Sequence, residues 1–233
     1  MNNKVAIITA ASKGIGAACA RVLKSRGYQL VLMSRSDDIN AVANDLNAMV
    51  CQGSVTNKDD LEKLVNLTIE NYGRIDAVVN NTGHPAKGQL LELSDQDWKQ
   101  GLDLILLNVT RIAQLVVPHM EKNDGGSFVN ISTYAALEPS PNFPVSSVLR
   151  AALASYTKLF SSQYAHLGIR MNAILPGYAD SYPVDGAALG QIPMGRPAKV
   201  EEIANAVAYL LSEEASYITG QNIKVDGGIS RSI

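Results

Sequence analysis

Short apolar runs, rich in β-branched residues, alternate along the chain with longer segments whose apolar residues recur at helical spacing. The runs Val5–Ile8 and Ala77–Val79 contain no polar position, as is typical of strands buried on both faces of a sheet. The predicted strands are Lys4–Thr9, Gln29–Ser34, Met49–Gln52, Asp76–Asn80, Ser127–Ser132, Arg170–Leu175 and Gln221–Val225; the predicted helices are Gly14–Gly27, Asp38–Ala48, Asn57–Tyr72, Ser94–His119, Pro144–Leu167 and Lys199–Ser212.

This alternation predicts an α/β fold: a doubly wound, parallel, seven-stranded sheet of the Rossmann type, with helices on both faces. The 233 residues suit one such unit, so we expect a single domain over residues 1–233. The least regular stretch, Gly177–Pro197, is rich in Gly, Pro and Tyr and is predicted to be a mobile loop over the ligand crevice.

Composition narrows the choice of partners. Hydrophobic residues make up 46% and charged residues 18% of the chain, and the net charge is -2. No stretch gathers the lysines and arginines that nucleic acid or anionic lipid would require, so neither partner is expected. The chain starts almost directly with an apolar run too short for a signal sequence or a membrane span, which predicts a cytoplasmic protein.

The cysteines predict no disulfide, and the acidic residues predict no metal site. Cys19 falls in a predicted helix and Cys51 in a predicted strand, so both are expected to be buried thiols rather than disulfide partners. No grouping of His, Cys, Asp and Glu has ligand spacing, and we expect no metal.

A glycine-containing turn joins the first predicted strand to the first predicted helix. Here backbone N–H groups and the helix dipole favour a pyrophosphate. An ordinary turn is the simpler reading, but its position in a βαβ unit favours a dinucleotide. Ala10 takes the place of the first glycine of the usual pattern, a small change. The predicted phosphate contacts are Ser12, Lys13, Gly14, Ile15 and Gly16.

The end of the second strand bears on the choice of cofactor. NAD sites usually carry a carboxylate there for the ribose diol, whereas this chain has Ser34 followed by Arg35. Arg35 and Lys13 are suited to pair with a 2′-phosphate, although either alone is also consistent with a solvated surface cation. We therefore expect NADP(H) to be preferred over NAD(H).

Further segments resemble the short-chain dehydrogenase/reductase family along the whole chain. They are Asn80–Gly83, Gly168–Asn172 with Pro176 and Gly177, and Tyr217–Gln221 with Val225–Gly228. The resemblance implies a Rossmann-type fold and a nicotinamide cofactor. The further cofactor contacts it implies are Ser54, Val55, Asn81, Thr82, Gly83, Arg150, Pro176, Gly177, Ala179 and Ser181.

Matching the family's catalytic pattern residue by residue gives an unusual result. Where the family has its Tyr-x-x-x-Lys pair, this chain has Ser146 and Arg150, and Thr133 stands at the family's serine. The asparagine position falls on Ile105, with Asn108 one helical turn later. The resemblance therefore implies a divergent member that lacks the usual Asn-Ser-Tyr-Lys residues.

These changes differ in severity. A serine hydroxyl lacks the acidity that a neighbouring cation gives to a tyrosine, so Ser146 cannot replace the proton donor. Arg150 keeps the positive charge and is suited to hold ribose hydroxyls, but its proton is not available for relay. Ile105 interrupts the water-linked proton path that the family's asparagine supports. Thr133 can still donate to a substrate oxygen.

The first hypothesis is an NADP(H)-dependent oxidoreductase whose proton donor has moved. Tyr134 is the first candidate because its neighbour Thr133 fixes it near the crevice; His84 and the loop residues Tyr178 and Tyr182 also follow carboxyl ends of strands. For each of them a packing or loop role is the simpler reading.

Two alternatives stay open. The loss of Tyr, Lys and Asn together is also consistent with an inactive nucleotide-binding homologue. A non-redox dehalogenase or lyase is a weaker alternative: halohydrin dehalogenase relatives also carry Arg at the Lys position, but they keep the tyrosine and lose the glycine turn.

The predicted crevice walls indicate a small or medium organic carbonyl or alcohol, with Tyr178, Tyr182 and Phe143 as apolar surfaces. The two long helices carry more apolar positions than one sheet contact should bury, which predicts a homodimer or homotetramer. The positions are Leu102, Leu104, Ile105, Leu106, Leu107, Leu149, Leu153, Tyr156, Leu159 and Phe160.

Overall fold

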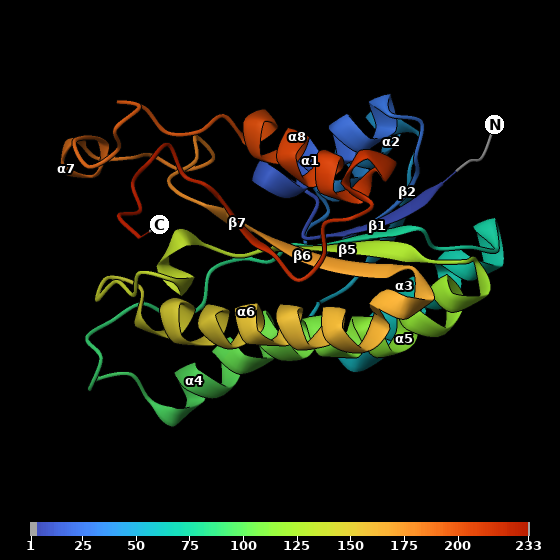
Figure 1. Cartoon of the computed structure of the whole chain (residues 1–233), viewed down its shortest axis with the longest axis horizontal. Coiled ribbons are helices and arrows are strands. Elements are labelled where there is room, and N and C mark those ends of the chain that lie inside the picture. The colour runs from blue at the N-terminus through green and yellow to red at the C-terminus, as the bar shows by residue number, and fades with distance from the viewer. Residues whose placement is uncertain (1–3, 233) are drawn as a thin grey trace.

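The computed structural model of the protein describes residues 4–232. Seven strands form one sheet in the order β3-β2-β1-β4-β5-β6-β7, and every neighbouring pair is parallel (Figure 1). The predicted α/β fold with a doubly wound parallel sheet is therefore confirmed. The strands are β1 Val5–Thr9, β2 Gln29–Ser34, β3 Met49–Gln52, β4 Ala77–Asn80, β5 Gly126–Ile131, β6 Ile169–Pro176 and β7 Asn222–Val225.

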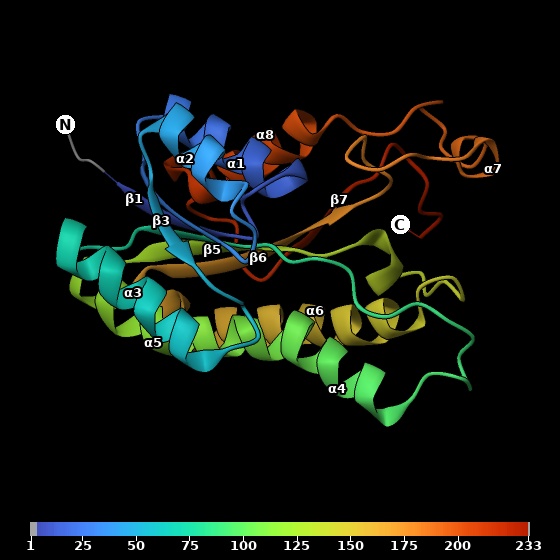
Figure 2. The same cartoon turned by 180° about the vertical axis from the view of Figure 1, so that it is seen from behind.

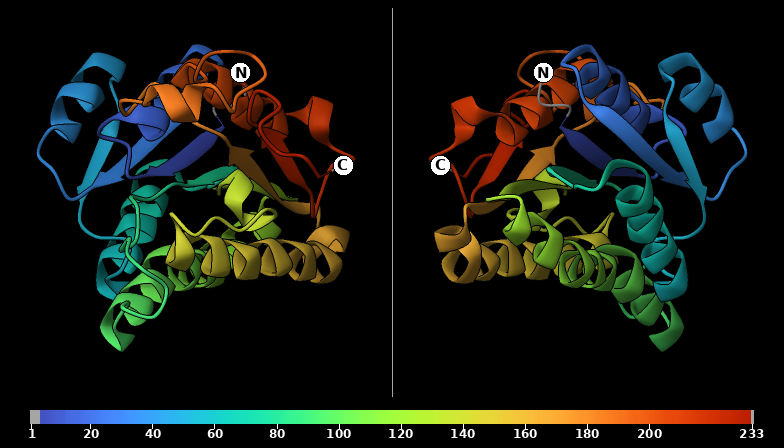
Figure 3. Two further views of the ribbon diagram at one scale, coloured as in Figure 1. Left: turned by 90° about the vertical axis from the view of Figure 1, so that its left-hand side faces the viewer. Right: turned by 90° about the vertical axis from the view of Figure 1, so that its right-hand side faces the viewer.

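Helices cover both faces of this sheet. One layer consists of α1, α2 and α8, and the other of α3, α4, α5 and α6 (Figures 1 and 2). The end-on views in Figure 3 show the sheet between the two layers. The helices are α1 Gly14–Ser25, α2 Ile39–Leu46, α3 Lys58–Tyr72, α4 Asp95–Leu102, α5 Asn108–Lys122, α6 Pro144–Tyr164, α7 Gly186–Leu189 and α8 Val200–Leu211.

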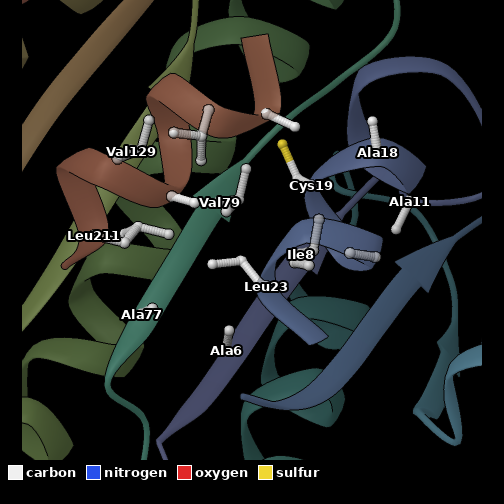
Figure 4. Packing of buried hydrophobic residues seen from close by; sticks show 14 of the residues in the cluster. Ala6, Ile8, Ala11, Ala18, Cys19, Leu23, Ala77, Val79, Val129 and Leu211 are labelled. Carbon is white, nitrogen blue, oxygen red and sulfur yellow. The ribbon is translucent and has the colours of Figure 1, made fainter. Parts of the chain in front are cut away.

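Alternate residues of each buried strand supply two separate cores. In β1, Ile8 packs in the cluster under α1 and α8, while Ile7 packs in the cluster on the other face. Figure 4 shows Ile8 in the first cluster with Cys19 and Leu23 from α1. Cys19 and Cys51 are both buried free thiols, as predicted, and burial raises the pKa of Cys19 to about 12.

The long helix predicted over Ser94–His119 is interrupted. A π-helical turn, Asp103–Leu107, separates α4 from α5. The Asn108 side chain donates from Nδ2 to the Leu104 carbonyl, so a side-chain donor bonds to a backbone carbonyl of this turn. The helical path then runs to Lys122, past the predicted end. The π turn escapes a pattern analysis because apolar spacing changes little over one turn.

This helical path, Asp95–Lys122, is long and apolar enough to span a membrane by length and composition alone. Its mean hydropathy is 1.4 over the best window, of which 39% is buried. In the fold, α5 packs against α3, β5 and β6, and α4 and the π turn pack against α6. Packing within the fold therefore buries part of this apolar stretch.

The predicted irregular loop Gly177–Pro197 contains some regular structure. It holds the short helix α7, whose N-terminus is capped by Asp185 through a 2.8 Å hydrogen bond from the Ala188 amide. A parallel bridge joins Ala179 to Ala198. In Figure 1, α7 lies at the end of the molecule opposite the N-terminus, beyond the carboxyl ends of the strands.

Candidate active site

The glycine turn between β1 and α1 has the backbone shape that its sequence pattern predicts. Gly14 has a φ of 56° and Ala10 a φ of 47°, so both residues adopt the left-handed conformation. For an alanine this conformation is strained. The turn is fixed by two hydrogen bonds: the Ala11 amide donates to the Met33 carbonyl at 3.1 Å, and Asn81 Nδ2 donates to the Ala10 carbonyl at 3.1 Å.

Gly16 allows this close approach. A Cβ at this position would lie 2.4 Å from the Ala10 carbonyl oxygen and 2.8 Å from Asn81 Nδ2. The first turn of α1 contains no acidic residue, and Lys13 stands exposed at its N-cap. The free N–H groups of this helix end and its dipole favour an anion, so the turn fits a pyrophosphate.

Asn81 and Thr82 follow β4 beside the turn. The Thr9 hydroxyl donates to the Asn81 carbonyl at 2.7 Å, and the Asn81 amide donates to the Thr9 hydroxyl at 2.9 Å. Among the described residues, the buried hydroxyl oxygens of Thr82 and Ser132 have no hydrogen-bond partner. Because buried polar atoms are normally paired, these two hydroxyls fit a site that a bound cofactor or substrate completes.

The segment after β6 approaches the same turn. A Cβ on Gly14 would lie 3.2 Å from the Cβ of Ser181, so the start of the predicted loop touches the glycine turn. Gly177 lies against Asp226 of the segment after β7, where a Cβ would approach its backbone to 3.0 Å. Pro176 ends β6, and Ala179 follows two residues after Gly177. The structure thus brings two distant predicted cofactor segments together at Ser181.

At the end of β2, a hydroxyl stands where an NAD site would have a carboxylate. Ser34 donates from its Oγ to Ser12 Oγ at 3.1 Å, which ties β2 to the glycine turn. The Arg35 side chain is exposed, and its carbonyl accepts from Gln52 Nε2 at 3.3 Å. This edge therefore carries hydroxyls and the exposed cations Lys13 and Arg35.

The predicted contacts Ser54 and Val55 follow β3. Asp60, which was not predicted to take part in this site, holds the first of them through its carboxylate. The Asp60 carboxylate accepts from the Ser54 amide at 2.8 Å. It lies so close to Gly53 that a Cβ there would come within 2.8 Å of it. An aspartate at the third position of a polar helix start carries no special signal in the sequence.

The reaction end is formed by β5 and the start of α6. Thr133 comes two residues after β5, and its Oγ1 accepts from the Ala135 amide at 3.4 Å. Arg150, on α6, is only 5% exposed. Its Nε donates to Ser146 Oγ at 3.2 Å and its Nη1 donates to the Ile131 carbonyl. The structure therefore brings Ser146 and Arg150 together beside the end of β5.

In the described part of the chain, no acid balances this buried guanidinium. Within residues 4–232, Arg150 takes part in no ion pair. Burial lowers the pKa of Arg150 to about 10, which leaves the group charged at neutral pH. An uncompensated buried charge is costly, and it points to a ligand that supplies the missing partner.

Tyr134 opens a single 3-10 turn directly after Thr133. Its ring centre lies 6.3 Å from that of Tyr178 in the loop after β6. Burial, followed by the proximity of Tyr178, raises the pKa of Tyr134 to about 12. Tyr134 is therefore protonated at neutral pH and able to donate a hydrogen bond, and it is a weaker acid than a free phenol.

His84 lies in the loop after β4 and packs edge-on against Tyr182, with ring centres 5.2 Å apart. Partial removal from water, followed by the positive charges of Arg150 and Lys87, lowers the pKa of His84. The ammonium of Lys87 in turn stands 5.1 Å from the centre of the Phe143 ring. His84 is thus neutral at pH 7, and three basic side chains gather around this part of the crevice.

The two candidate positions for the family's asparagine differ in environment. Ile105 is 1% exposed and packs in the hydrophobic cluster between the sheet and the layer of α3, α5 and α6. Asn108 is also buried, at 6% exposed, and follows the π turn. The Ile105 side chain cannot form a hydrogen bond, and the Asn108 side chain has no described hydrogen bond to Thr133, Ser146 or Arg150.

A buried polar network beneath the site was not predicted. Asn80 Nδ2 donates to Asn130 Oδ1 at 2.8 Å, and Asn130 Nδ2 donates to Thr157 Oγ1 at 3.0 Å. The network links β4, β5 and α6. Asparagines at the ends of two apolar strands were the available signal, because a buried amide needs partners.

Comparisons with known proteins agree with this geometry. Residues 9–230 match the family described as Enoyl-(Acyl carrier protein) reductase. The 3-oxoacyl-[acyl-carrier-protein] reductase of Thermotoga maritima is 30% identical and covers 98% of both chains. Cis-4-hydroxycyclohexanecarboxylate dehydrogenase of Sinomonas cyclohexanicum is 33% identical over 97% of this chain and 96% of its own.

Solved structures show the same likeness. The crystal structure of YwfH, an NADPH dependent reductase involved in bacilysin biosynthesis, has a TM-score of 0.94 and 29% identity, covering 100% of both chains. L-sorbose reductase from Gluconobacter frateurii, solved with NADPH and L-sorbose, has a TM-score of 0.92 and 27% identity, covering 99% of this chain and 98% of its own. The chain therefore belongs to the short-chain dehydrogenase/reductase family of NAD(P)-dependent oxidoreductases.

Proposed function

We propose that this protein is an NADP(H)-dependent oxidoreductase of a small or medium carbonyl compound or alcohol, and that its proton comes from a group other than residue 146. One observation carries the proposal: a formed glycine turn stands beside a reaction end in which Ser146 takes the tyrosine position. The hydroxyl at 146 is already held by Nε of the buried Arg150. It is an aliphatic hydroxyl with no useful acidity at neutral pH.

The cofactor residues follow from the geometry of the turn. The N-terminus of α1 with Ser12 and Gly14 would hold the pyrophosphate, and Asn81 would stand beside the adenosine. A bound dihydronicotinamide would supply the hydride. Thr133 and Tyr134, at the end of β5, are the hydroxyl donors proposed for the substrate oxygen.

NADP(H) is the proposed form of the cofactor. Ser34 brings no negative charge to the end of β2, and the exposed Arg35 and Lys13 are suited to a 2′-phosphate. Two similar structures support this choice, since YwfH is described as NADPH dependent and L-sorbose reductase was solved with NADPH.

Tyr134 is the proposed proton donor for carbonyl reduction. In this step a hydride would reach the carbonyl carbon while the carbonyl oxygen takes a proton from Tyr134. Its raised pKa keeps the proton on the phenol before the reaction. His84 is the second candidate, but it is neutral at pH 7 because its pKa is lowered.

We also propose that residues 1–233 form a single domain and that the protein is cytoplasmic. We further propose that it forms a homo-oligomer. Part of the apolar surface that led to this expectation packs within the chain, since Ile105, Leu153 and Phe160 are buried. Leu159 on α6 remains 63% exposed and Val148 52% exposed, so α6 is the proposed contact surface. Light scattering that gives the mass of one chain at micromolar concentration would contradict an oligomer.

The decisive experiment measures NADPH binding by fluorescence and then NADPH consumption at 340 nm in the same sample. The panel contains aldehydes, ketones, diketones and 4-oxocyclohexanecarboxylate, which is the ketone of the alcohol named for the Sinomonas relative. Binding with turnover supports the proposal. Binding with no turnover on any compound favours the alternative of an inactive nucleotide-binding homologue, and halide release from a halohydrin panel would favour a dehalogenase.

A further inference from the structure

The guanidinium of Arg150 is buried where α6 meets the end of β5. Nη1 reaches the carbonyl of Ile131, the last residue of β5, and Nε reaches Ser146 near the start of α6. The positive charge also acts on His84 in the loop after β4. The group therefore lies near the carboxyl ends of β4 and β5, on the edge of the sheet at which open α/β sheets bind their ligands.

Arg150 has unused donors. A guanidinium carries five N–H groups. The two described hydrogen bonds use Nε–H and one N–H of Nη1, which leaves the second N–H of Nη1 and both of Nη2. An Nη1 and Nη2 pair is the end of the guanidinium that binds the two oxygens of a carboxylate side by side.

The charge of Arg150 also needs a partner. Both described acceptors, a carbonyl oxygen and a hydroxyl, are neutral. Within the described residues its side chain has no acidic partner, although it is 5% exposed. A cofactor ribose would accept hydrogen bonds but would bring no charge, and the pyrophosphate is expected at the glycine turn beyond β1. The neighbouring Lys87 adds to the local positive potential, whereas His84 is neutral at pH 7.

We propose that the substrate carries a carboxylate, and that this group binds the free Nη edge of Arg150 when the reactive carbon lies against the cofactor. This inference rests on the proposed oxidoreductase function and names its substrate class. Lys87, above Phe143 at 5.1 Å, stands at the rim where it would attract the same anion.

The test compares an acid with its neutral ester. Isothermal titration measures 4-oxocyclohexanecarboxylate and its methyl ester binding to the NADP⁺-loaded protein, in which no reduction occurs. We expect the acid to bind at least about 10-fold more tightly, as charge-assisted pairing of a desolvated arginine implies. In Arg150→Gln, which keeps a hydrogen-bond donor and removes the charge, we expect the acid and the ester to bind within about 3-fold of each other.

Controls separate the explanations. Arg21→Gln removes a charge from the exposed face of α1 and should keep the wild-type preference for the acid. The NADP⁺ affinity of Arg150→Gln should fall less than the acid affinity, since only ribose contacts would be lost and the phosphates are bound elsewhere. If Arg150→Gln does not fold, the comparison of acid and ester in the wild type still decides.

Several results would overturn the inference. They are equal binding of acid and ester by the wild type, an acid preference that persists in Arg150→Gln, or an NADP⁺ affinity that falls as far as the acid affinity. If inorganic phosphate binds through Arg150 and the acid does not, the group bound by Arg150 would be a phosphate and not a carboxylate. If the wild type binds neither NADP⁺ nor NADPH, the proposed function itself fails; loss of the acid preference alone leaves that function intact.

Discussion

The backbone determines one end of the crevice, and side chains determine the other. Around the glycine turn, backbone atoms and small residues determine the shape: Gly16 stands where a Cβ would meet the Ala10 carbonyl at 2.4 Å. At the reaction end, side chains determine the chemistry, and Ser146 and Arg150 meet beside β5. Backbone constraints leave few substitutions possible, whereas a surface of side chains can change its chemistry on the same fold. This difference fits the proposal that the cofactor end follows the family pattern and the reaction end departs from it.

The largest expected effect concerns the proton donor. Replacing Tyr134 by Phe should lower kcat for carbonyl reduction by about 100- to 10,000-fold, the usual range for a general acid. Ser146→Ala is the matched control and should lower kcat by less than about 10-fold, because an aliphatic hydroxyl does not supply the proton. Steady-state consumption of NADPH at 340 nm measures both. An unchanged kcat in Tyr134→Phe would remove this residue from the mechanism.

The same assignment predicts a pH profile. With a pKa of about 12, Tyr134 keeps its proton throughout the neutral and moderately alkaline range. The kcat for reduction should therefore show no loss from ionisation of Tyr134 between pH 7 and about pH 10, the unperturbed pKa of a phenol. A fall with a midpoint near pH 8 that disappears in Tyr134→Phe would contradict this environment.

The cofactor end should respond to a single added carbon. Gly16→Ala places a Cβ against the Ala10 carbonyl and Asn81, so the turn must shift. We expect a loss of roughly 1–3 kcal/mol in unfolding free energy, as for an overpacked site. We also expect weaker NADPH binding in a fluorescence titration. Gly186→Ala, where a Cβ meets nothing within 4 Å, is the control and should change neither. Wild-type NADPH affinity in Gly16→Ala would show that the turn does not hold the cofactor.

A smaller effect is expected at the adenosine ribose. Arg35→Ala should weaken NADPH binding by about 10-fold and leave NADH binding unchanged, since one solvent-exposed charged hydrogen bond is lost. The ratio of the two dissociation constants is the measured quantity, with Arg21→Ala as an exposed-charge control. Equal affinities of the wild type for NADPH and NADH would overturn the predicted preference.

The smallest effect concerns the strained alanine in the turn. Ala10→Gly restores the usual glycine at a position with a φ of 47°. It should raise the unfolding free energy by about 0.5–1 kcal/mol, because glycine adopts this conformation without a clash but loses more entropy on folding. Denaturant unfolding measures the change. A less stable Ala10→Gly protein would show that Ala10 is not strained.

Much of the fold was predictable because buried parallel strands leave continuous apolar runs such as Ala77–Val79. The short helix α7 was missed because four residues held by an Asp185 cap leave no periodic signal. The shape of the glycine turn was predictable because its glycines serve local geometry. The burial of Arg150 could not be read from the sequence, because it depends on the Ile131 carbonyl, which folding brings to α6 from β5.

The most direct test of the central claim follows the hydride itself. The wild-type protein is incubated with NADPH deuterated at C4 of the nicotinamide, in separate samples for each face, together with the carbonyl panel. Mass spectrometry then examines the alcohols formed. The account predicts deuterium in the product from one of the two labelled faces. NADPH that binds while no product acquires deuterium from either face would contradict an oxidoreductase with a relocated proton donor.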